Sequence, residues 1–137
     1  MSGNVPRIKQ LIALAEQALT TAQVNFETGD FRATVNRTYY AIFYAASAML
    51  LTIGVERRKH SGVISAFRNH FVKTGLIETE YSNIYGETLV TREDADYVIE
   101  VLIAFDTAEP ALNQARRFVQ RMYEYLGAKG FLDEPVE

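Results

Sequence analysis

The sequence DFRATVNRTYYAIFYAASAMLLTI occupies residues 30–53 and decides the fold. Large apolar residues recur along it at three- and four-residue steps, which is the spacing of one helix face. Alanine and threonine form a second stripe at positions 41, 45, 48 and 52. A helix that is apolar on two sides must be covered on two sides, and small residues allow a close approach. We expect this cover to come both from the chain's own helices and from a second copy of the protein.

Residues 38–55 raise the question of a membrane helix, because they carry no formal charge over 18 residues. That length reaches the lower limit of a membrane span. However, three tyrosines, two threonines and Ser47 interrupt the apolar character, and no other segment is hydrophobic enough to pair with it in a bilayer. The sequence therefore predicts a helix buried in a protein core and no membrane association.

Proline is absent from residues 7–109, a span of 103 residues. Such a span is unusual for a strand-rich domain, because the turns of these domains favour proline. Glycines at positions 29, 54, 75 and 127 are placed to end helices, and the apolar spacing between them is helical. The sequence predicts an all-α, up-and-down bundle of about five helices, at residues 6–28, 30–53, 61–74, 78–98 and 106–126.

Local signals predict how two of these helices begin. Asp30 is expected to cap the second helix, because its carboxylate can accept hydrogen bonds from free backbone N–H groups. Asp106 and Glu109 have the spacing of a capping box for the last helix, and the proline that follows costs little inside a first turn. We expect one domain over residues 1–127 and an acidic, flexible tail over residues 128–137.

Composition and motifs exclude several classes of protein. The 137 residues carry a net charge of −3, so the chain does not coat nucleic acid by bulk charge. It has no cysteine, two histidines ten residues apart and no Glu-x-x-His pair, which argues against disulfides, zinc sites and di-iron centres. Neither a phosphate-binding glycine loop nor a nucleophile elbow is present. We expect no cofactor and no metal, and the lack of a targeting signal predicts a cytoplasmic protein.

Arg92 is the strongest functional candidate, because it is a charged residue within an apolar stripe. Asp96 follows four residues later, so the two side chains can meet across one helical turn. The pair can be a structural ion pair that fixes the register of the helix, which is the commoner case. It can also be an anion-binding arginine oriented by a carboxylate, because the guanidinium fork pairs with phosphate. The members of the stripe are Tyr81, Tyr85, Thr88, Arg92, Ala95 and Ile99.

Two further polar groups flank the uncharged stretch. Asn36 and Arg37 precede it, and they form either a network that ties the second helix to the fourth or a second phosphate ligand beside Arg92. A basic loop opens the third helix, and it is either solvated or a local site for RNA or nucleotide. Cations and the free N–H groups of a helix start both favour phosphate. The loop consists of Arg57, Arg58, Lys59 and His60.

Four short motifs follow one another along the chain. They are Asn36-Arg37-Thr38-Tyr39-Tyr40-Ala41, His60-Ser61-Gly62, Phe71-Val72-Lys73-Thr74-Gly75 and Arg92-Glu93-Asp94-Ala95-Asp96-Tyr97. In this order they resemble the HEPN domain proteins, most closely the small stand-alone prokaryotic branch, and the resemblance spans residues 8–126. It implies a compact helical bundle that is usually a homodimer. Such proteins are commonly encoded beside a minimal nucleotidyltransferase, and several of these pairs are toxin–antitoxin systems.

The resemblance also implies a chemistry. Active HEPN proteins are metal-independent endoribonucleases with an arginine and a histidine that are separated by four to six residues. Cleaving RNA through its own 2′-OH needs a proton acceptor and a cation, which suit histidine and arginine. Arg92 matches the arginine, but no histidine follows any arginine of this chain at that spacing. A tyrosine beyond the histidine is the target of the partner transferase in some members, and Tyr97 is the nearest equivalent here.

The sequence therefore predicts a HEPN-like dimer that partners a nucleotidyltransferase and binds a nucleotide or RNA phosphate in an Arg92-centred cleft. The second helix is expected to contribute to the dimer interface. One alternative is a divergent metal-independent endoribonuclease that uses Arg92, Asp96 and His60. Another is a structural adaptor without a ligand. The expected phosphate-binding residues are Arg92, Arg37, Asn36, Asp96 and Tyr97.

Overall fold

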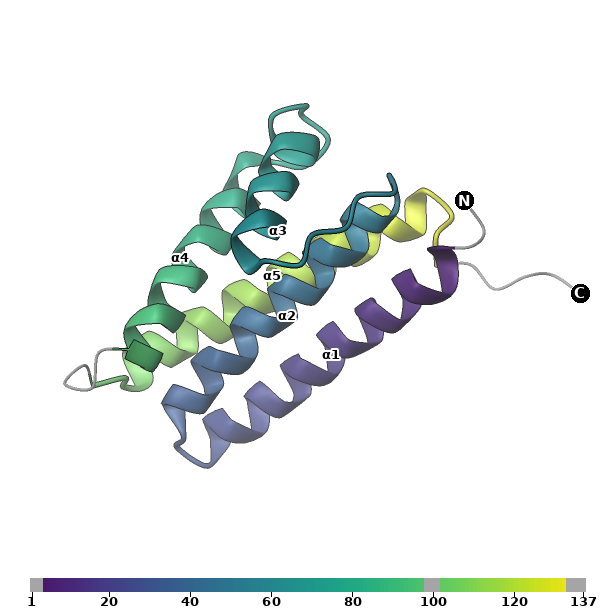
Figure 1. Ribbon diagram of the computed structural model, residues 1–137. Helices are drawn as coiled ribbons and strands as arrows, with labels where there is room; N and C mark the ends of the chain where they lie inside the picture. Colours follow the sequence, from purple (N-terminus) through teal and green to yellow (C-terminus); the bar gives the residue numbers. More distant parts are fainter. Residues whose placement is uncertain (1–3, 98–101, 133–137) are drawn as a thin grey trace, which may run out of the picture.

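The computed structural model describes residues 4–97 and 102–132, and it is a helical bundle (Figure 1). No strand occurs in this part of the chain, which confirms the all-α prediction. A π-helical segment, η2, directly follows the third of five α-helices. In chain order the elements are α1 (Val5–Glu27), α2 (Phe31–Leu51), α3 (His60–Phe67), η2 (Arg68–Val72), α4 (Thr79–Tyr97) and α5 (Phe105–Ala128).

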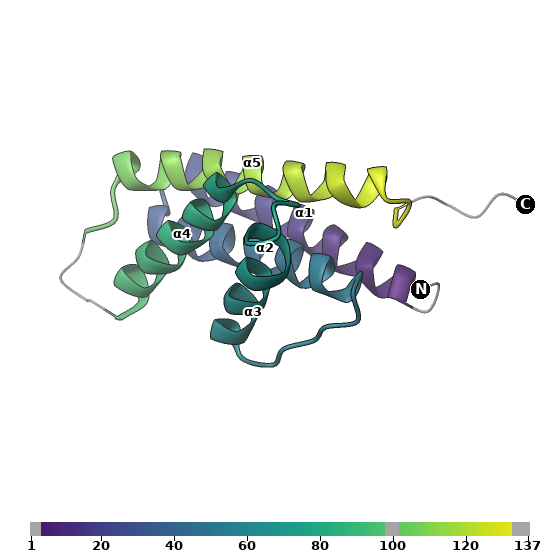
Figure 2. The same cartoon turned by 90° about the horizontal axis from the view of Figure 1, so that it is seen from above.

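The long helix α2 lies at the centre and contacts each of the other four α-helices. Helices α1, α2 and α5 run alongside one another, and α3 and α4 form an arm that leaves this layer (Figures 1 and 2). Ala41, Ala45 and Ala48 are completely buried by the chain itself. Helices of the same chain therefore cover α2 at these alanines. The three alanines have no exposed surface that a second copy could contact.

The uncharged segment of α2 belongs to the protein core, as predicted. Tyr39, Ile42 and Met49 each expose 1% of their surface or less. Over the ranges that the structure describes, no helix has the length and apolar character to cross a membrane. The hydrophobic run is therefore explained by burial against other helices.

The start of α2 follows the local signals in the sequence. The Asp30 carboxylate accepts a hydrogen bond from the backbone N–H of Ala33 at 3.2 Å, which confirms the predicted cap. Gly29 has a φ of 81°, in the left-handed region that glycine adopts without a steric penalty. The chain can therefore reverse between α1 and α2 within three residues, which places the two helices side by side.

The third helix differs from the prediction, because α3 changes into a π-helix at Arg68. Arg68 reaches across to α4, where its Nε donates a hydrogen bond to Ser82 Oγ at 2.8 Å. A Cβ atom on Gly86 would lie 2.6 Å from Arg68 Nη2, so a larger residue there would require the end of this side chain to shift. Glycine inside a helix costs about 1 kcal/mol relative to alanine, and here it lets the Arg68 side chain lie close against α4.

The last helix begins earlier and ends later than the sequence indicated. Its cap is Ala104, without a side-chain hydrogen bond, so the predicted capping box of Asp106 and Glu109 is wrong. Pro110 consequently lies in the second turn, where it removes one helical hydrogen bond. Gly127 remains helical, because apolar packing continues beyond it: Phe131 and Leu132 pack against the core. These two residues belong to the segment that was expected to be a tail. Residues 133–137 lie outside the described residues, as do residue 98 of the predicted fourth helix and Ile99 of its stripe.

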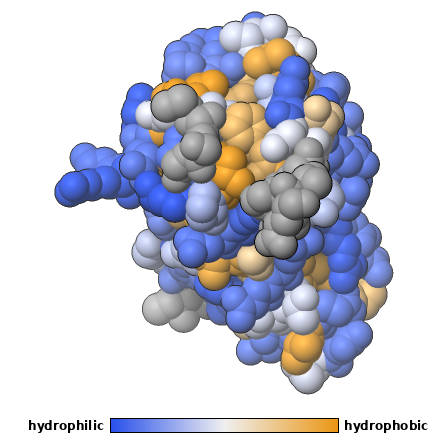
Figure 3. Space-filling model, turned by 90° about the vertical axis from the view of Figure 1, so that its right-hand side faces the viewer, coloured by the Kyte–Doolittle hydropathy of each residue, from blue (hydrophilic) through white to orange (hydrophobic). Residues whose placement is uncertain are grey.

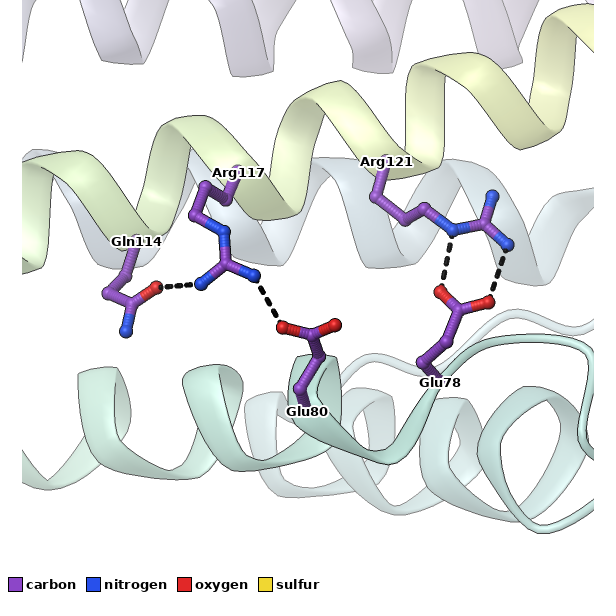
Figure 4. A network of polar contacts seen from close by, with 5 residues as sticks. All are labelled: Glu78, Glu80, Gln114, Arg117 and Arg121. Carbon is purple, nitrogen blue, oxygen red and sulfur yellow. Dashed lines mark hydrogen bonds and ion pairs between the residues drawn. The ribbon is translucent and has the colours of Figure 1, made fainter.

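Two ion pairs tie the beginning of α4 to α5 (Figure 4). Arg121 makes a two-pronged contact with Glu78, with its Nε 2.7 Å from Oε1 and its Nη2 3.1 Å from Oε2. Arg117 pairs with Glu80 one turn earlier and also donates a hydrogen bond to Gln114. The hydrogen bond from Arg121 lowers the pKa of Glu78, so the carboxylate stays charged at neutral pH. These contacts link the start of α4 to α5.

One end of the molecule has an apolar surface. Figure 3 views the end near the termini and shows hydrophobic surface surrounded by hydrophilic residues. Ile53, just beyond the end of α2, is 49% exposed. The turn between α1 and α2 lies at the opposite end (Figure 1). The polar hollow described below is formed at that opposite end, where the large side chains of Leu102 and Phe105 are also exposed.

Tyr85 provides a test of the core. Its ring is fully buried against Phe67 and Phe118, and within the described ranges its hydroxyl has no hydrogen-bond partner. An unpaired buried hydroxyl costs about 1–3 kcal/mol. We therefore expect Tyr85→Phe to leave the free energy of unfolding unchanged or to raise it by about 1 kcal/mol, as measured by urea denaturation. A loss of more than 1 kcal/mol would mean that the hydroxyl is bonded.

Candidate functional site

Arg92 lies on α4, where its side chain is largely buried against α2. Its guanidinium carbon is 4.9 Å from the ring centroid of Tyr39 and 5.6 Å from that of Tyr40. Its Nε is 3.0 Å from Asp96 Oδ2, and the two side chains are 16% and 26% exposed. This contact is an ion pair without hydrogen-bond geometry, because Arg92 Nε has no hydrogen-bond partner in the described residues. The predicted pairing of Arg92 with Asp96 is therefore present. Arg92 lies against the rings of Tyr39 and Tyr40, which we call the aromatic support.

Arg37 approaches the same support from α2. Its guanidinium carbon lies 4.9 Å from the ring centroid of Tyr40, which is three residues further along the helix. Its Nε and Nη2 donate hydrogen bonds to Asn36 Oδ1 at 3.3 and 3.2 Å. Arg37 and Arg92 thus contact one tyrosine ring, and two positive charges from different helices meet at Tyr40.

His60 joins this cluster from the first residue of α3. Its ring centroid is 4.4 Å from that of Phe43 and 5.7 Å from those of Tyr39 and Tyr40. Burial, and secondly the charge of Arg92, lower the pKa of His60 below its ordinary value. Burial also raises the pKa of Tyr39 to about 12. At neutral pH the site therefore holds cationic arginines beside a neutral imidazole, which can accept a proton.

The lowered pKa of His60 predicts how stability depends on pH. Between the folded pKa and the ordinary value of 6.5, the unfolded chain binds more protons than the folded one. The free energy of unfolding should therefore be highest above about pH 6.5 and should decrease as the pH falls below this value. We expect a His60→Gln variant to lose less stability than the wild type over this interval, as measured by urea denaturation at several pH values. Identical pH dependence in both proteins would contradict the prediction.

A polar hollow adjoins these residues at the start of α2. Its volume is about 420 Å³, and it is formed by the end of α1, the turn, the first two turns of α2 and Asp96 of α4. Arg92 is not part of its wall, so the hollow borders the arginine cluster instead of being centred on Arg92. The residues that line it are Asn25, Asp30, Arg32, Ala33, Asn36, Arg37 and Asp96.

Not every predicted site residue joins the cluster. Tyr97 is 72% exposed at the end of α4. Arg57, Arg58 and Lys59 are exposed in the loop between α2 and α3, although this loop leads directly into His60. Across the described ranges, no group of three or more histidine, aspartate or glutamate side chains is placed to hold a metal ion. The structure thus brings together Arg92, Asp96, Asn36, Arg37 and His60, with the basic loop as their neighbour in the chain.

Sequence reasoning missed the aromatic support and most of the hollow. The spacing of Arg37 and Tyr40 was visible, because residues three apart share a helix face. The contact of Arg92 with Tyr39 had no such signal, since the two residues are 53 positions apart. Asn25 and Asp30 gave no signal as wall residues either, because a turn brings them beside α4 only in the folded chain.

Comparison with known proteins places the chain in a family. The HEPN domain model matches residues 8–125. "Putative toxin MJ0605" of Methanocaldococcus jannaschii is 39% identical over 119 residues, which cover 87% of this chain and 88% of that protein. "Putative toxin MJ0142" of the same organism is 31% identical over 125 residues, or 91% and 85% of the two chains. "UPF0332 protein glr0978" of Gloeobacter violaceus is 33% identical over 135 residues, or 88% and 97%. The chain therefore belongs to the HEPN domain family.

Proposed function

We propose that this HEPN protein is a toxin-like RNA-binding protein that holds phosphate groups through Arg37 and Arg92. The observation that carries the proposal is the convergence of two guanidinium groups from α2 and α4 on the ring of Tyr40. Arginine binds phosphate through a planar fork of donors, and an aromatic ring beneath it holds the fork in place. The toxin names of two relatives support the biological role.

The surrounding charges favour a polyanion at this place. The exposed Arg58 and Lys59 lead into His60, so further cations lie beside the cluster along the chain. The whole protein carries a net charge of −3, so the attraction for RNA is local to this region. RNA binding should therefore be sensitive to salt and to single arginine replacements here, and insensitive to arginines elsewhere.

The test measures the affinity for a single-stranded RNA at several salt concentrations. Arg37→Ala should weaken binding and reduce the slope of log affinity against log salt by roughly 0.7 to 1, the loss expected for one phosphate contact. Arg116→Ala, an exposed position of α5, is the matched control and should leave both quantities unchanged. Equal affinity for wild type and Arg37→Ala would refute the proposed site.

His60 favours a second candidate, a metal-independent endoribonuclease. The neutral imidazole would accept the proton of the 2′-OH, and the 2′-oxygen would attack the adjacent phosphorus. The P–O5′ bond would break, leaving a 2′,3′-cyclic phosphate, and the 5′-oxygen would take a proton from water. The arginine cluster would stabilise the charge on the phosphorane. His60 is the only histidine within the cluster, and Asp96 would orient Arg92.

Cleavage can be tested with labelled RNA in the presence of EDTA. We expect products with a cyclic phosphate end from the wild type and none from His60→Ala, whereas His70→Ala, outside the cluster, should cleave normally. If both histidine variants cleave RNA, His60 is not the proton acceptor and this candidate is eliminated. If neither the wild type nor the variants cleave RNA, the candidate is also eliminated. The binding function remains in both cases.

Dimerisation and a nucleotidyltransferase partner complete the proposal. The support for a dimer is the half-buried aromatic face of α2, with Tyr40, Phe43 and Tyr44, because rows of partly exposed aromatic rings are typical of interfaces. Light scattering at micromolar concentration should give twice the chain mass of 15.5 kDa, and purification from the native host should bring down a protein identified as a nucleotidyltransferase. A monomer, or a preparation without the transferase, would contradict the corresponding part.

A further inference from the structure

The polar hollow beside Arg37 has the composition of a nucleobase site. We propose that it binds an unpaired guanine of an RNA whose phosphates contact Arg37 and Arg92. This inference rests on the proposed RNA binding and adds the identity of the base. The residues that carry it are Asn25, Asp30, Arg32, Asn36, Arg37 and Asp96.

The charges within the hollow are balanced. Two guanidinium groups and two carboxylates line it, so its wall has no net charge. An anion therefore gains little by entering, whereas the neighbouring cluster at Tyr40 has two cations close together. A nucleotide has the same division into a charged phosphate and a neutral base. The phosphate fits the arginine cluster, and the base fits the hollow.

The hollow offers hydrogen-bond donors and acceptors that suit the edges of guanine. Guanine presents two acceptors, O6 and N7, on one edge, and it presents N–H donors on the Watson–Crick and minor-groove side. Arginine is the usual partner of O6 and N7, and a carboxylate accepts from N–H donors. The hollow contains both kinds of group, together with the amide of Asn25 and the NH2 group of Asn36, whose oxygen accepts from Arg37.

Arg37 lies between the hollow and the arginine cluster. It lines the hollow and also contacts the ring of Tyr40, so it connects the base site to the phosphate site. A base can enter the hollow only when its edges are free, because pairing in a duplex uses the same donors and acceptors. The proposal therefore predicts single-stranded RNA as the ligand, with guanine recognised next to the bound phosphate.

The test uses uridine-rich, single-stranded RNA octamers that carry one central guanine, adenine, cytosine or uracil. Wild type should bind the guanine octamer roughly fivefold or more tightly than the others, which corresponds to one good base contact of about 1 kcal/mol. Asn25→Ala should reduce this ratio without changing the dependence on salt, because Asn25 lines the hollow and carries no charge. Asn113→Ala, exposed on α5, is the matched control and should retain the ratio.

The outcomes separate this inference from the proposed function. Equal affinity for all four octamers, a preference for another base, or a guanine preference that survives Asn25→Ala overturns the base site. If Arg37→Ala still weakens binding in such a case, phosphate binding stands without a base site. If no octamer binds at all, both proposals are overturned. A guanine preference that is lost in Asn25→Ala and kept in Asn113→Ala supports the inference.

Discussion

Replacing Arg92 with alanine is expected to lower the free energy of unfolding by about 2–3 kcal/mol and to weaken RNA binding about tenfold. The stability loss follows from two contacts with tyrosine rings and from the Asp96 carboxylate that is left without its partner. A desolvated cation–π contact is worth about 2 kcal/mol, and an unpaired, partly buried carboxylate adds to the loss. The binding loss follows from one missing phosphate ligand.

The measurement must separate these two effects. Urea denaturation gives the stability, and RNA affinity is measured at a temperature where the variant is fully folded. Arg92→Lys retains the charge but not the planar fork, so it should recover part of the affinity. If Arg92→Ala destabilises the protein and the folded variant binds RNA as tightly as wild type, Arg92 is structural. The adaptor interpretation would then replace phosphate binding at this residue.

Replacing Phe118 with alanine is expected to destabilise the protein by about 3–5 kcal/mol. Its fully buried ring lies where α5 meets α3 and α4, with ring centroids 5.4 Å from Phe67, 5.7 Å from Tyr85 and 6.2 Å from Tyr81. Removing it leaves a cavity that helices held from several sides cannot close. Because small domains are stable by only about 5–15 kcal/mol, the variant should be close to unfolding.

Thermal and urea denaturation measure this effect, and Tyr123→Ala is the control on the same helix. Tyr123 is 44% exposed, so its replacement should change stability by about 0.5 kcal/mol or less. Equal losses for the two variants would contradict the packing of α5 described above.

The architecture could be predicted because local chemistry and burial point the same way. Asp30 caps α2 as expected, and the two stripes of α2 are buried along most of their length, with Ile53 at the end exposed. The prediction failed where tertiary packing overrides local signals. Asp106 and Glu109 have the spacing of a capping box, yet α5 begins before them. Similarly, nothing local indicates the change to π-helix at Arg68, which accompanies its contact with Ser82 on α4.

The candidate site was predictable only in part, for a related reason. Arg92 and Asp96 lie on one helix face, so their spacing was enough to pair them. The approach of His60 to Tyr39, and of Asn25 to Asp96, depends on how separate helices dock. A single sequence contains the residue types for such a site but not the distances between them.

The arm of α3 and α4 has a consequence for the timing of site assembly. His60 and Arg92 are on the arm, whereas Arg37 and Tyr40 are on the central helix. Proteins open locally, and an element packed on fewer sides opens before the core does. An undocked arm would separate the two arginines while α1, α2 and α5 stay folded. Amide hydrogen exchange should accordingly be faster in α4 than in α2, and any partner that clamps the arm would switch the site on without touching it.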